Sequence, residues 1–353
     1  MSGLARRVLT ATTTTATLLI LATACSASTS APVPVPGGAS GGSSSESSVG
    51  ASSAGYPVTL TNCGRELTID AEPQRVVSLW QSTTEALLAL GLRDRIVAVQ
   101  EAYAPYPDSV AQDAAALPTI GGQTGFPSKE VLLSEMPDFV TGQVLDGYAF
   151  DASRGYATVE QLEQSGATVY GANLCTSADA QSTDTWNIES ALTTLRDYGI
   201  VFGVSAKADE VIGTLRDDEQ KVIDAVEGAP TVRTAFFNGG TGPLNVLAGG
   251  LHDDLIRTAG GEDVFPAGSV YVSKEEFAAS DADVILVGTY PGQDFATQKE
   301  FLEQTFPDLP AVRSGRISEV PTQEADSSIS VMVGLTRIAN ALHPDLDLPV
   351  PSS

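Results

Sequence analysis

Aromatic and amide side chains recur at the predicted ends of buried strands in this sequence. Tyrosine and tryptophan combine a flat apolar face with a polar edge, which suits the binding of organic molecules. Ligands of parallel α/β sheets bind beyond the carboxyl ends of the strands. These residues are therefore candidates for one binding site, although each aromatic ring could instead pack its own loop. The candidates are Trp80, Gln81, Tyr103, Tyr106, Gln143, Tyr148, Asn238 and Tyr290, together with Arg154, which could pair with an anionic ligand.

Catalytic motifs are missing from the sequence that follows residue 56. It contains no Gly-x-Ser-x-Gly elbow, His-Glu-x-x-His, Gly-x-Gly-x-x-Gly, phosphate-binding loop or Cys-x-x-Cys. The chain has two histidines, His252 and His343, whereas a bare zinc or manganese site needs several histidine and carboxylate ligands in one cluster. We therefore predict a binding protein with no catalytic residue, no metal site and no cofactor of its own.

The charge of the chain is strongly negative. It has 19 lysines and arginines against 44 aspartates and glutamates. Nucleic acids and anionic membranes attract basic surfaces. The composition therefore argues against binding to either of them through such a surface.

The first residues predict an export signal over residues 1–24. A pair of arginines precedes a threonine-rich apolar stretch that ends in Leu18 to Leu21 and is too short for a good membrane span. The segment from Leu21 to Cys25 resembles the lipobox of bacterial lipoproteins, although Ala22 stands where leucine is usual. This resemblance implies a diacylglycerol-modified Cys25 that anchors the protein to the extracytoplasmic face of the cell membrane. An ordinary secretory signal with a chance cysteine is the alternative.

Residues 25–56 are predicted to form a flexible tether. The segment after Cys25 consists mostly of Ser, Gly, Ala and Pro, so it cannot bury enough apolar surface to fold. Beyond it, Cys63 and Cys175 form an even pair in an exported protein, which indicates one disulfide. Two separate buried thiols are the alternative.

From Val58 onward, short strand-like runs alternate with helix-like runs, which predicts parallel sheets covered by helices. Two helices are expected to begin at capping boxes, Ser82–Glu85 and Thr158–Gln161. The expected strands are 75–79, 96–99, 139–140, 168–170, 232–237, 284–287 and 317–320, and the later helices are 252–259, 274–279, 298–304 and 329–342.

One long helix is expected between the two alternating regions. Residues 188–227 have helical patterns with an interruption near Gly203, and the second part spans roughly 30 Å at about 1.5 Å per residue. The expected division is an N-terminal α/β lobe over residues 57–203, a linking helix over 204–229 and a C-terminal α/β lobe over 230–348.

A short repeat relates the two halves. Residues 128–133 (SKEVLL) reappear as residues 273–278 (SKEEFA), and each copy continues to an aspartate that precedes a strand. Serine caps helices and glutamate suits the first turn, which explains each copy separately but not their equivalent placement. The repeat therefore indicates two related lobes.

Several stretches, taken in order, resemble the ferric-siderophore and cobalamin solute-binding proteins of ABC importers over about residues 57–345. They are Pro73–Leu79, Thr84–Leu92, Asp94–Val97, Pro118–Gly121, Glu130–Val140, Ala259–Phe265 and the second copy of the repeat. The resemblance implies two α/β lobes joined by a single long backbone helix, with the ligand in the cleft between them and little closure on binding. It also implies that Glu130 and Glu275 dock into arginine pockets of the permease dimer through charge-assisted pairs.

The resemblance and the candidate residues favour a ferric siderophore as the ligand. Its chelator already fills the coordination sphere of the iron, so aromatic and polar groups suffice and iron enters only as part of the ligand. Cobalamin binders of the family tend to place tryptophans in the cleft, and only Trp80 is well placed on sequence grounds. Haem would want an axial ligand, and His252 is expected to have an ordinary role in the first turn of a helix. Cobalamin and haem are the alternatives, followed by a surface sensor and an enzyme, and the expected state is a monomer.

Overall fold

The computed structural model describes residues 55–123, 125–172, 174–176, 179 and 185–352. The predicted signal peptide, the lipidation site Cys25 and all but the last two residues of the predicted tether lie outside this part. Tyr56 belongs to the folded unit, because its hydroxyl donates a hydrogen bond to the Val201 carbonyl at 2.7 Å. Within the described residues, no helix has both the length and the apolar character needed to cross a membrane.

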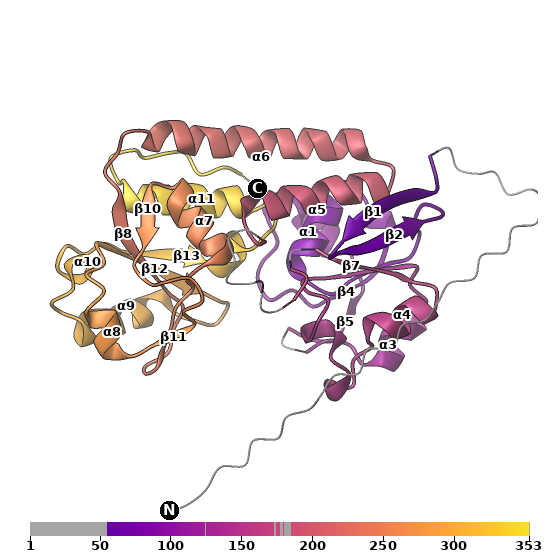
Figure 1. Cartoon of the computed structure of the whole chain (residues 1–353), viewed down its shortest axis with the longest axis horizontal. Coiled ribbons are helices and arrows are strands. Elements are labelled where there is room, and N and C mark those ends of the chain that lie inside the picture. The colour runs from indigo at the N-terminus through magenta and orange to yellow at the C-terminus, as the bar shows by residue number, and fades with distance from the viewer. Residues whose placement is uncertain (1–54, 124, 173, 177–178, 180–184, 353) are drawn as a thin grey trace, which may run out of the picture. The chain divides into compact units, whose positions relative to one another are not determined.

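Two parallel sheets form the centres of two α/β lobes, as predicted (Figure 1). The N-terminal sheet has the order β5-β4-β3-β6-β7, with β3 (Val76–Ser78), β4 (Ile96–Gln100), β5 (Thr119–Ile120), β6 (Phe139–Gly142) and β7 (Thr168–Gly171). The C-terminal sheet has the order β10-β8-β12-β13, with β8 (Val232–Phe237), β10 (Gly261–Asp263), β12 (Val284–Thr289) and β13 (Ile317–Pro321). All six residues of β12 are buried, as expected for a parallel strand that helices cover on both faces.

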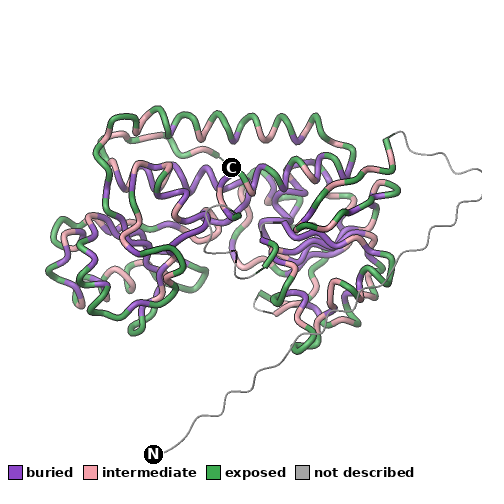
Figure 2. The backbone as a smooth tube through the Cα atoms, in the orientation of Figure 1, coloured by how far each residue is buried: buried purple, intermediate pink, exposed green. Residues whose placement is uncertain are grey.

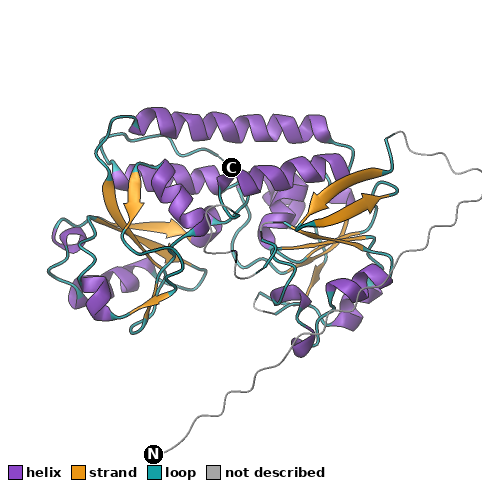
Figure 3. Ribbon diagram, viewed as in Figure 1, coloured by secondary structure: helices purple, strands orange, loops and turns teal. Residues whose placement is uncertain are grey.

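Helices cover the two sheets (Figure 3). They are α1 (Gln81–Ala89), α2 (Asp108–Ala114), α3 (Lys129–Ser134), α4 (Val159–Gln164), α5 (Ile188–Val201), α6 (Ser205–Val226), α7 (Gly250–Thr258), α8 (Lys274–Ala278), α9 (Phe295–Thr305), α10 (Pro310–Arg313) and α11 (Val331–Leu342). The long helix α6 connects the N-terminal lobe to β8 of the C-terminal lobe and packs on α5 and α11. The two lobes joined by one long helix are therefore confirmed.

A continuous apolar core joins the lobes beneath α6. It includes Leu87 and Phe139 of the N-terminal lobe, Leu215 of α6, and Phe236 and Leu335 of the C-terminal lobe. Figure 2 shows the buried segments running through both lobes. Because one packed core spans the junction, large movements of one lobe against the other would expose apolar surface.

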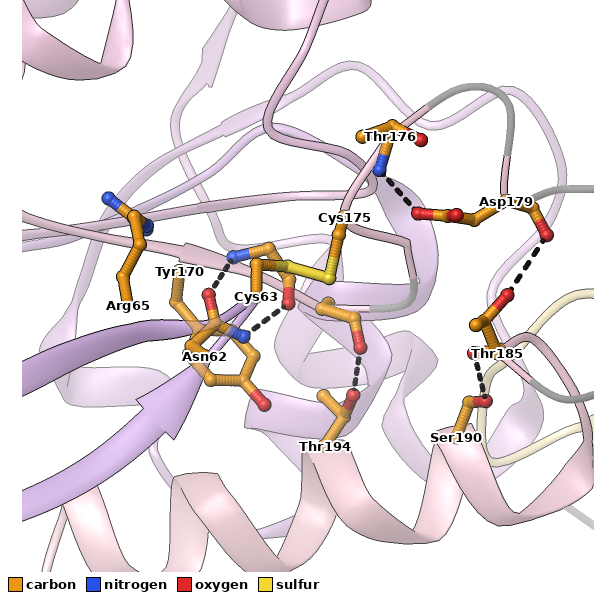
Figure 4. The surroundings of a disulfide bond; sticks show 12 residues. Asn62, Cys63, Arg65, Tyr170, Cys175, Thr176, Asp179, Thr185, Ser190 and Thr194 are labelled. Carbon is orange, nitrogen blue, oxygen red and sulfur yellow. Dashed lines mark hydrogen bonds between the residues drawn. A yellow bond between two sulfur atoms is a disulfide. The ribbon is translucent and has the colours of Figure 1, made fainter. Parts of the chain in front are cut away.

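Two antiparallel strand pairs were not expected. One is the hairpin of β1 (Val58–Asn62) and β2 (Arg65–Ile69), and the other pairs β9 (Leu244–Asn245) with β11 (Tyr271–Val272). The turn of the first hairpin carries Cys63, which forms the predicted disulfide with Cys175 over a Cα–Cα distance of 5.1 Å (Figure 4). Beside it, the Asn62 side chain exchanges two hydrogen bonds with the Gly171 backbone, at 2.8 and 2.9 Å.

One of the two predicted capping boxes is wrong. Thr158 and Gln161 cap α4 reciprocally, as expected. In contrast, α1 begins one residue before Ser82 and has no side-chain cap, and Glu85 is 1% exposed. The start of α1 is buried. The Thr83 and Thr84 hydroxyls there donate hydrogen bonds to the Trp80 carbonyl.

Candidate ligand-binding cleft

A cavity of about 530 Å³ lies between the two lobes, within the ~300–1,000 Å³ typical of small-molecule sites. Its lining from the N-terminal half comprises Trp80, Tyr103, Gln123, Gln143, Tyr148, Leu174 and Trp186. Its lining from the C-terminal half comprises Asn245, Val246, Leu247, Ala248, Gly249, His252, Ser269, Val270, Tyr290, Pro291, Thr322, Ala325 and Asp326.

The carboxyl ends of the strands deliver several of these side chains. Trp80 is the second residue after β3, Gln143 directly follows β6, and Tyr290 directly follows β12. Thr322 in the same way follows β13, which neighbours β12. The cleft therefore lies where a pair of parallel α/β sheets is expected to bind a ligand.

Aromatic rings from both lobes meet in this cleft. The Trp80 ring lies 5.5 Å from that of Tyr103 and 6.3 Å from that of Tyr148, between ring centroids. Tyr103 in turn lies 6.5 Å from Tyr290 of the other lobe. Tyr148 is 50% exposed and Tyr290 is 39% exposed, so their faces are available to an organic ligand.

Asp326 joins the two lobes across the cleft. Its Oδ2 atom accepts hydrogen bonds from Trp80 Nε1 at 2.8 Å and from the Tyr103 hydroxyl at 3.2 Å, and its Oδ1 atom accepts one from the Ser327 amide at 2.8 Å. Burial raises the pKa of this carboxyl group, and burial also raises the pKa of Tyr103 well above its usual value. Sequence reasoning missed Asp326, because it follows a short 3₁₀ turn (Thr322–Ala325) instead of a strand.

The cavity lining also contains Trp186, which was not among the predicted candidates. Its indole Nε1 donates to Ser327 Oγ at 2.7 Å, and its ring packs edge-on against His252 at 5.2 Å. The sequence signal available was its position just before the capped start of α5 at Asn187. The expectation that Trp80 alone would be well placed is therefore wrong, since both tryptophans of the chain line the cavity.

His252 lies in the first turn of α7, as expected, but it also lines the cavity. Its ring is edge-on to both Trp186 and Phe236, the latter at 5.4 Å. Burial lowers the pKa of His252 to about 4. The side chain is consequently neutral at physiological pH and serves as a buried ring in the aromatic wall.

The predicted candidates divide into two groups. Trp80, Tyr103, Gln143, Tyr148 and Tyr290 line the cavity. The remaining four, Gln81, Tyr106, Asn238 and Arg154, do not.

Each member of the second group makes a different contact. Gln81 accepts a bond from the Ala104 amide at 3.0 Å and donates one to Glu85 at 3.0 Å. Tyr106 packs against the main core. Asn238 donates to Asn245, which itself lines the cavity, at 2.7 Å. The Arg154 guanidinium is 70% exposed and lies 3.4 Å from Asp151, so the expectation that it faces an anionic ligand is wrong in this structure.

The repeated glutamates occupy equivalent positions. Ser128 caps α3 and Ser273 caps α8 through their hydroxyl groups, and Glu130 and Glu275 follow in the first turn of each helix, both exposed. Figure 1 shows α3 and α8 on the side of their lobes that faces away from α6. Hydrogen bonds from its own backbone and from Ser128 hold the pKa of Glu130 below its usual value, which keeps this carboxylate ionised.

The fold and the cleft identify a class of protein. Two parallel α/β lobes, a single long connecting helix and a ligand-sized cavity between them define a solute-binding protein. A family model described as periplasmic binding protein matches residues 76–324. The chain belongs to this family, and it is an extracytoplasmic substrate-binding protein of the ABC-transporter type with no enzymatic role.

Similar proteins differ in the ligands that their names record. A cobalamin-binding protein of Halobacterium salinarum is 26% identical over 301 residues, covering 82% of this chain and 74% of that protein. An uncharacterized ABC transporter substrate-binding lipoprotein of Bacillus subtilis, YvrC, is 24% identical over 309 residues, covering 82% and 87%. A solved structure described as an ABC-type Fe³⁺-hydroxamate transport system from Saccharomonospora viridis has a TM-score of 0.64 at 24% identity, covering 82% of this chain and 99% of that one.

Proposed function

We propose that this protein captures a ferric siderophore outside the membrane and delivers it to an ABC import permease. The observation that carries the proposal is the aromatic cleft between the lobes, in which Trp80, Tyr103 and Tyr290 offer faces and polar edges from both sides. No cluster of three or more His, Cys, Asp or Glu side chains suited to a metal ion occurs among the described residues. An iron ligand of this cleft would therefore arrive with its coordination sphere already filled by a chelator.

Intrinsic fluorescence provides a direct test, because both tryptophans of the chain line the cavity. We would titrate the purified full-length protein in detergent with ferric hydroxamate, catecholate and citrate chelates, alongside haem and cobalamin. Saturable quenching by one iron chelate at submicromolar concentration is the expected result. Trp80→Phe and Trp186→Phe variants then assign the quenching to one ring or both. A response to haem or cobalamin alone would overturn the siderophore and keep the cleft as the binding site.

Cobalamin is the second candidate ligand. Two tryptophans line the cleft, and the family resemblance links cleft tryptophans to cobalamin binding. A relative from Halobacterium salinarum also carries the name of a cobalamin-binding protein. The same titration separates the two candidates, because a cobalamin binder would be quenched by cobalamin and not by any of the ferric chelates.

Docking to the permease is assigned to Glu130 and Glu275. Both are exposed in the first turn of equivalent helices, one in each lobe. A carboxylate paired with a guanidinium is directional and charge-assisted, which suits a transient contact of fixed register. Each lobe would thus supply one anchoring point, so that both lobes must be in place for docking.

The docking test compares two double variants of equal charge change. Glu130→Arg with Glu275→Arg should abolish uptake while ligand binding stays unchanged. The matched control is Glu160→Arg with Glu300→Arg, which reverses one exposed glutamate in each lobe on α4 and α9. Unchanged uptake in the first variant, or equal loss in both, would remove the assignment.

Membrane attachment is proposed through Cys25. The segment up to this residue resembles a lipobox, and the relative YvrC is named as a lipoprotein. A Cys25→Ser variant should be released from the membrane fraction into the soluble fraction. Retention of that variant in the membrane fraction would argue against a lipid anchor at this position.

A further inference from the structure

The lining of the cleft contains an acidic side chain, that of Asp326, but no lysine or arginine among the described residues. The residues between 55 and 352 that the structure does not describe include neither of these basic types in the sequence. A ligand in this cleft therefore meets neutral polar groups, aromatic faces and one acid.

We propose that the cleft selects a ferric chelate without net negative charge, of the hydroxamate class, and that Asp326 receives a cationic group on it, such as a protonated amine. The inference rests on the proposed function and specifies the chemistry of the same ligand. A hydroxamate binds Fe³⁺ as a singly charged oxygen pair and a catecholate as a doubly charged one. A complete hydroxamate shell thus leaves the complex neutral, whereas a complete catecholate shell leaves it strongly anionic.

The hydrogen-bond donors around Asp326 favour its ionised form, whereas its burial disfavours that form. Its residue is 7% exposed, and it accepts hydrogen bonds from Trp80 Nε1, the Tyr103 hydroxyl and the Ser327 amide. All three donors are neutral, and so is Ser82, whose side chain also hydrogen-bonds this carboxyl group. A buried carboxylate without a cationic partner is costly, so a cation delivered by the ligand would compensate it.

Basic side chains near the cleft are already engaged elsewhere. Arg337 binds Glu324 through Nε to Oε2 at 2.7 Å, on the segment that leads to Asp326. Arg257 of α7 pairs with Asp254, and Arg154 pairs with Asp151. These arginines are not oriented to neutralise an anionic chelate in the cavity.

Two further features act in the same direction. Trp80 and Tyr103 donate hydrogen bonds to Asp326 Oδ2, and the Tyr148 ring lies 6.3 Å from that of Trp80. Aromatic rings thus lie beside this carboxyl group, and their faces attract cations through their quadrupoles. The formal net charge of the chain is −25, so the field of the whole protein disfavours the approach of an anion.

The test uses one ferric trihydroxamate in three forms. Its terminal amine is left free, acetylated, or succinylated, so that the iron core is constant while the charge changes from positive through neutral to negative. We would measure dissociation constants on the full-length protein by tryptophan quenching and by calorimetry. The wild-type protein should bind the free amine about tenfold or more tighter than the acetylated form, because hydrogen bonds to charged groups are among the stronger ones. The succinylated form should bind about tenfold or more weaker than the acetylated form.

Variants assign the preference to one residue. Asp326→Asn should bring the ratio between the free-amine and acetylated forms to about one, while Asp308→Asn, which removes an exposed carboxylate in the same lobe, should leave that ratio unchanged. Equal wild-type affinity for all three forms overturns the charge selection and leaves siderophore binding intact. Binding of catecholate or citrate chelates in preference to all three forms also overturns it. Failure to bind any ferric chelate refutes the proposed function itself.

Discussion

One buried carboxyl group, that of Glu85, should contribute a loss of stability as the pH rises from about 5 to 8. Glu85 lies in α1 with 1% of its surface exposed. Its Oε1 atom accepts a hydrogen bond from Gln81 Nε2 at 3.0 Å, Ser328 lies beside it, and none of the groups that shift its pKa is a cation. Burial therefore raises the pKa of Glu85 from 4.5 to about 8.

The sign follows from counting protons. Between pH 4.5 and about 8, the folded state keeps the proton of Glu85 while the unfolded state has lost it. Stability then decreases as pH rises through this window, by about 1.4 kcal/mol per pH unit at most. Below the window both states are protonated, and above it both are ionised. The full cost at high pH is on the order of 5 kcal/mol.

Glu85→Gln removes this titration while keeping an amide of similar shape. The variant should match the wild type in its free energy of unfolding near pH 4.5 and exceed it by about 3 kcal/mol at pH 7, since about 1.4 kcal/mol accrues for each pH unit. Urea unfolding followed by circular dichroism at pH 5, 6, 7 and 8 measures the difference. Glu66→Gln, which removes an exposed carboxyl group, is the control. A difference between Glu85→Gln and wild type that does not change with pH would refute the reasoning.

Three further predictions concern stability. Replacing Cys63 and Cys175 together by serine removes a disulfide between residues 112 apart in sequence and should lower the free energy of unfolding by about 2–5 kcal/mol. Adding reductant should destabilise the wild type to the same extent and leave the variant unchanged. Phe277→Ala empties a fully buried position in the C-terminal core and should cost about 3–5 kcal/mol in urea unfolding. Gly199→Ala places a methyl group 2.6 Å from the Ala208 side chain where α5 meets α6 and should lower the stability by about 1–3 kcal/mol, whereas no loss would show that the two helices separate easily.

The sequence alone determined the architecture. Alternating strand and helix patterns, the interruption at Gly203 and the uninterrupted pattern that follows it predicted two α/β lobes joined by α6, and β8 occupies the residues expected. These are local signals, because periodicity and turn chemistry are written in neighbouring residues. The same holds for the Ser128 and Ser273 caps, whose equivalence follows from a repeat visible in the chain. The helix α9 begins three residues before the predicted start at residue 298, because Asp294 caps it.

Only the tertiary structure decided which side chains share the cleft. Trp186, His252 and Asp326 are separated from Trp80 by more than 100 residues each, and nothing local to them predicts that they converge. Arg154 shows the converse, since a loop position after β6 placed it among the candidates and the folded loop turned it towards Asp151. Glu85 was likewise expected in a capping box, but α1 begins at Gln81 without a side-chain cap and Glu85 is 1% exposed. Burial and charge balance arise from contacts between distant segments, and a linear pattern does not contain those contacts.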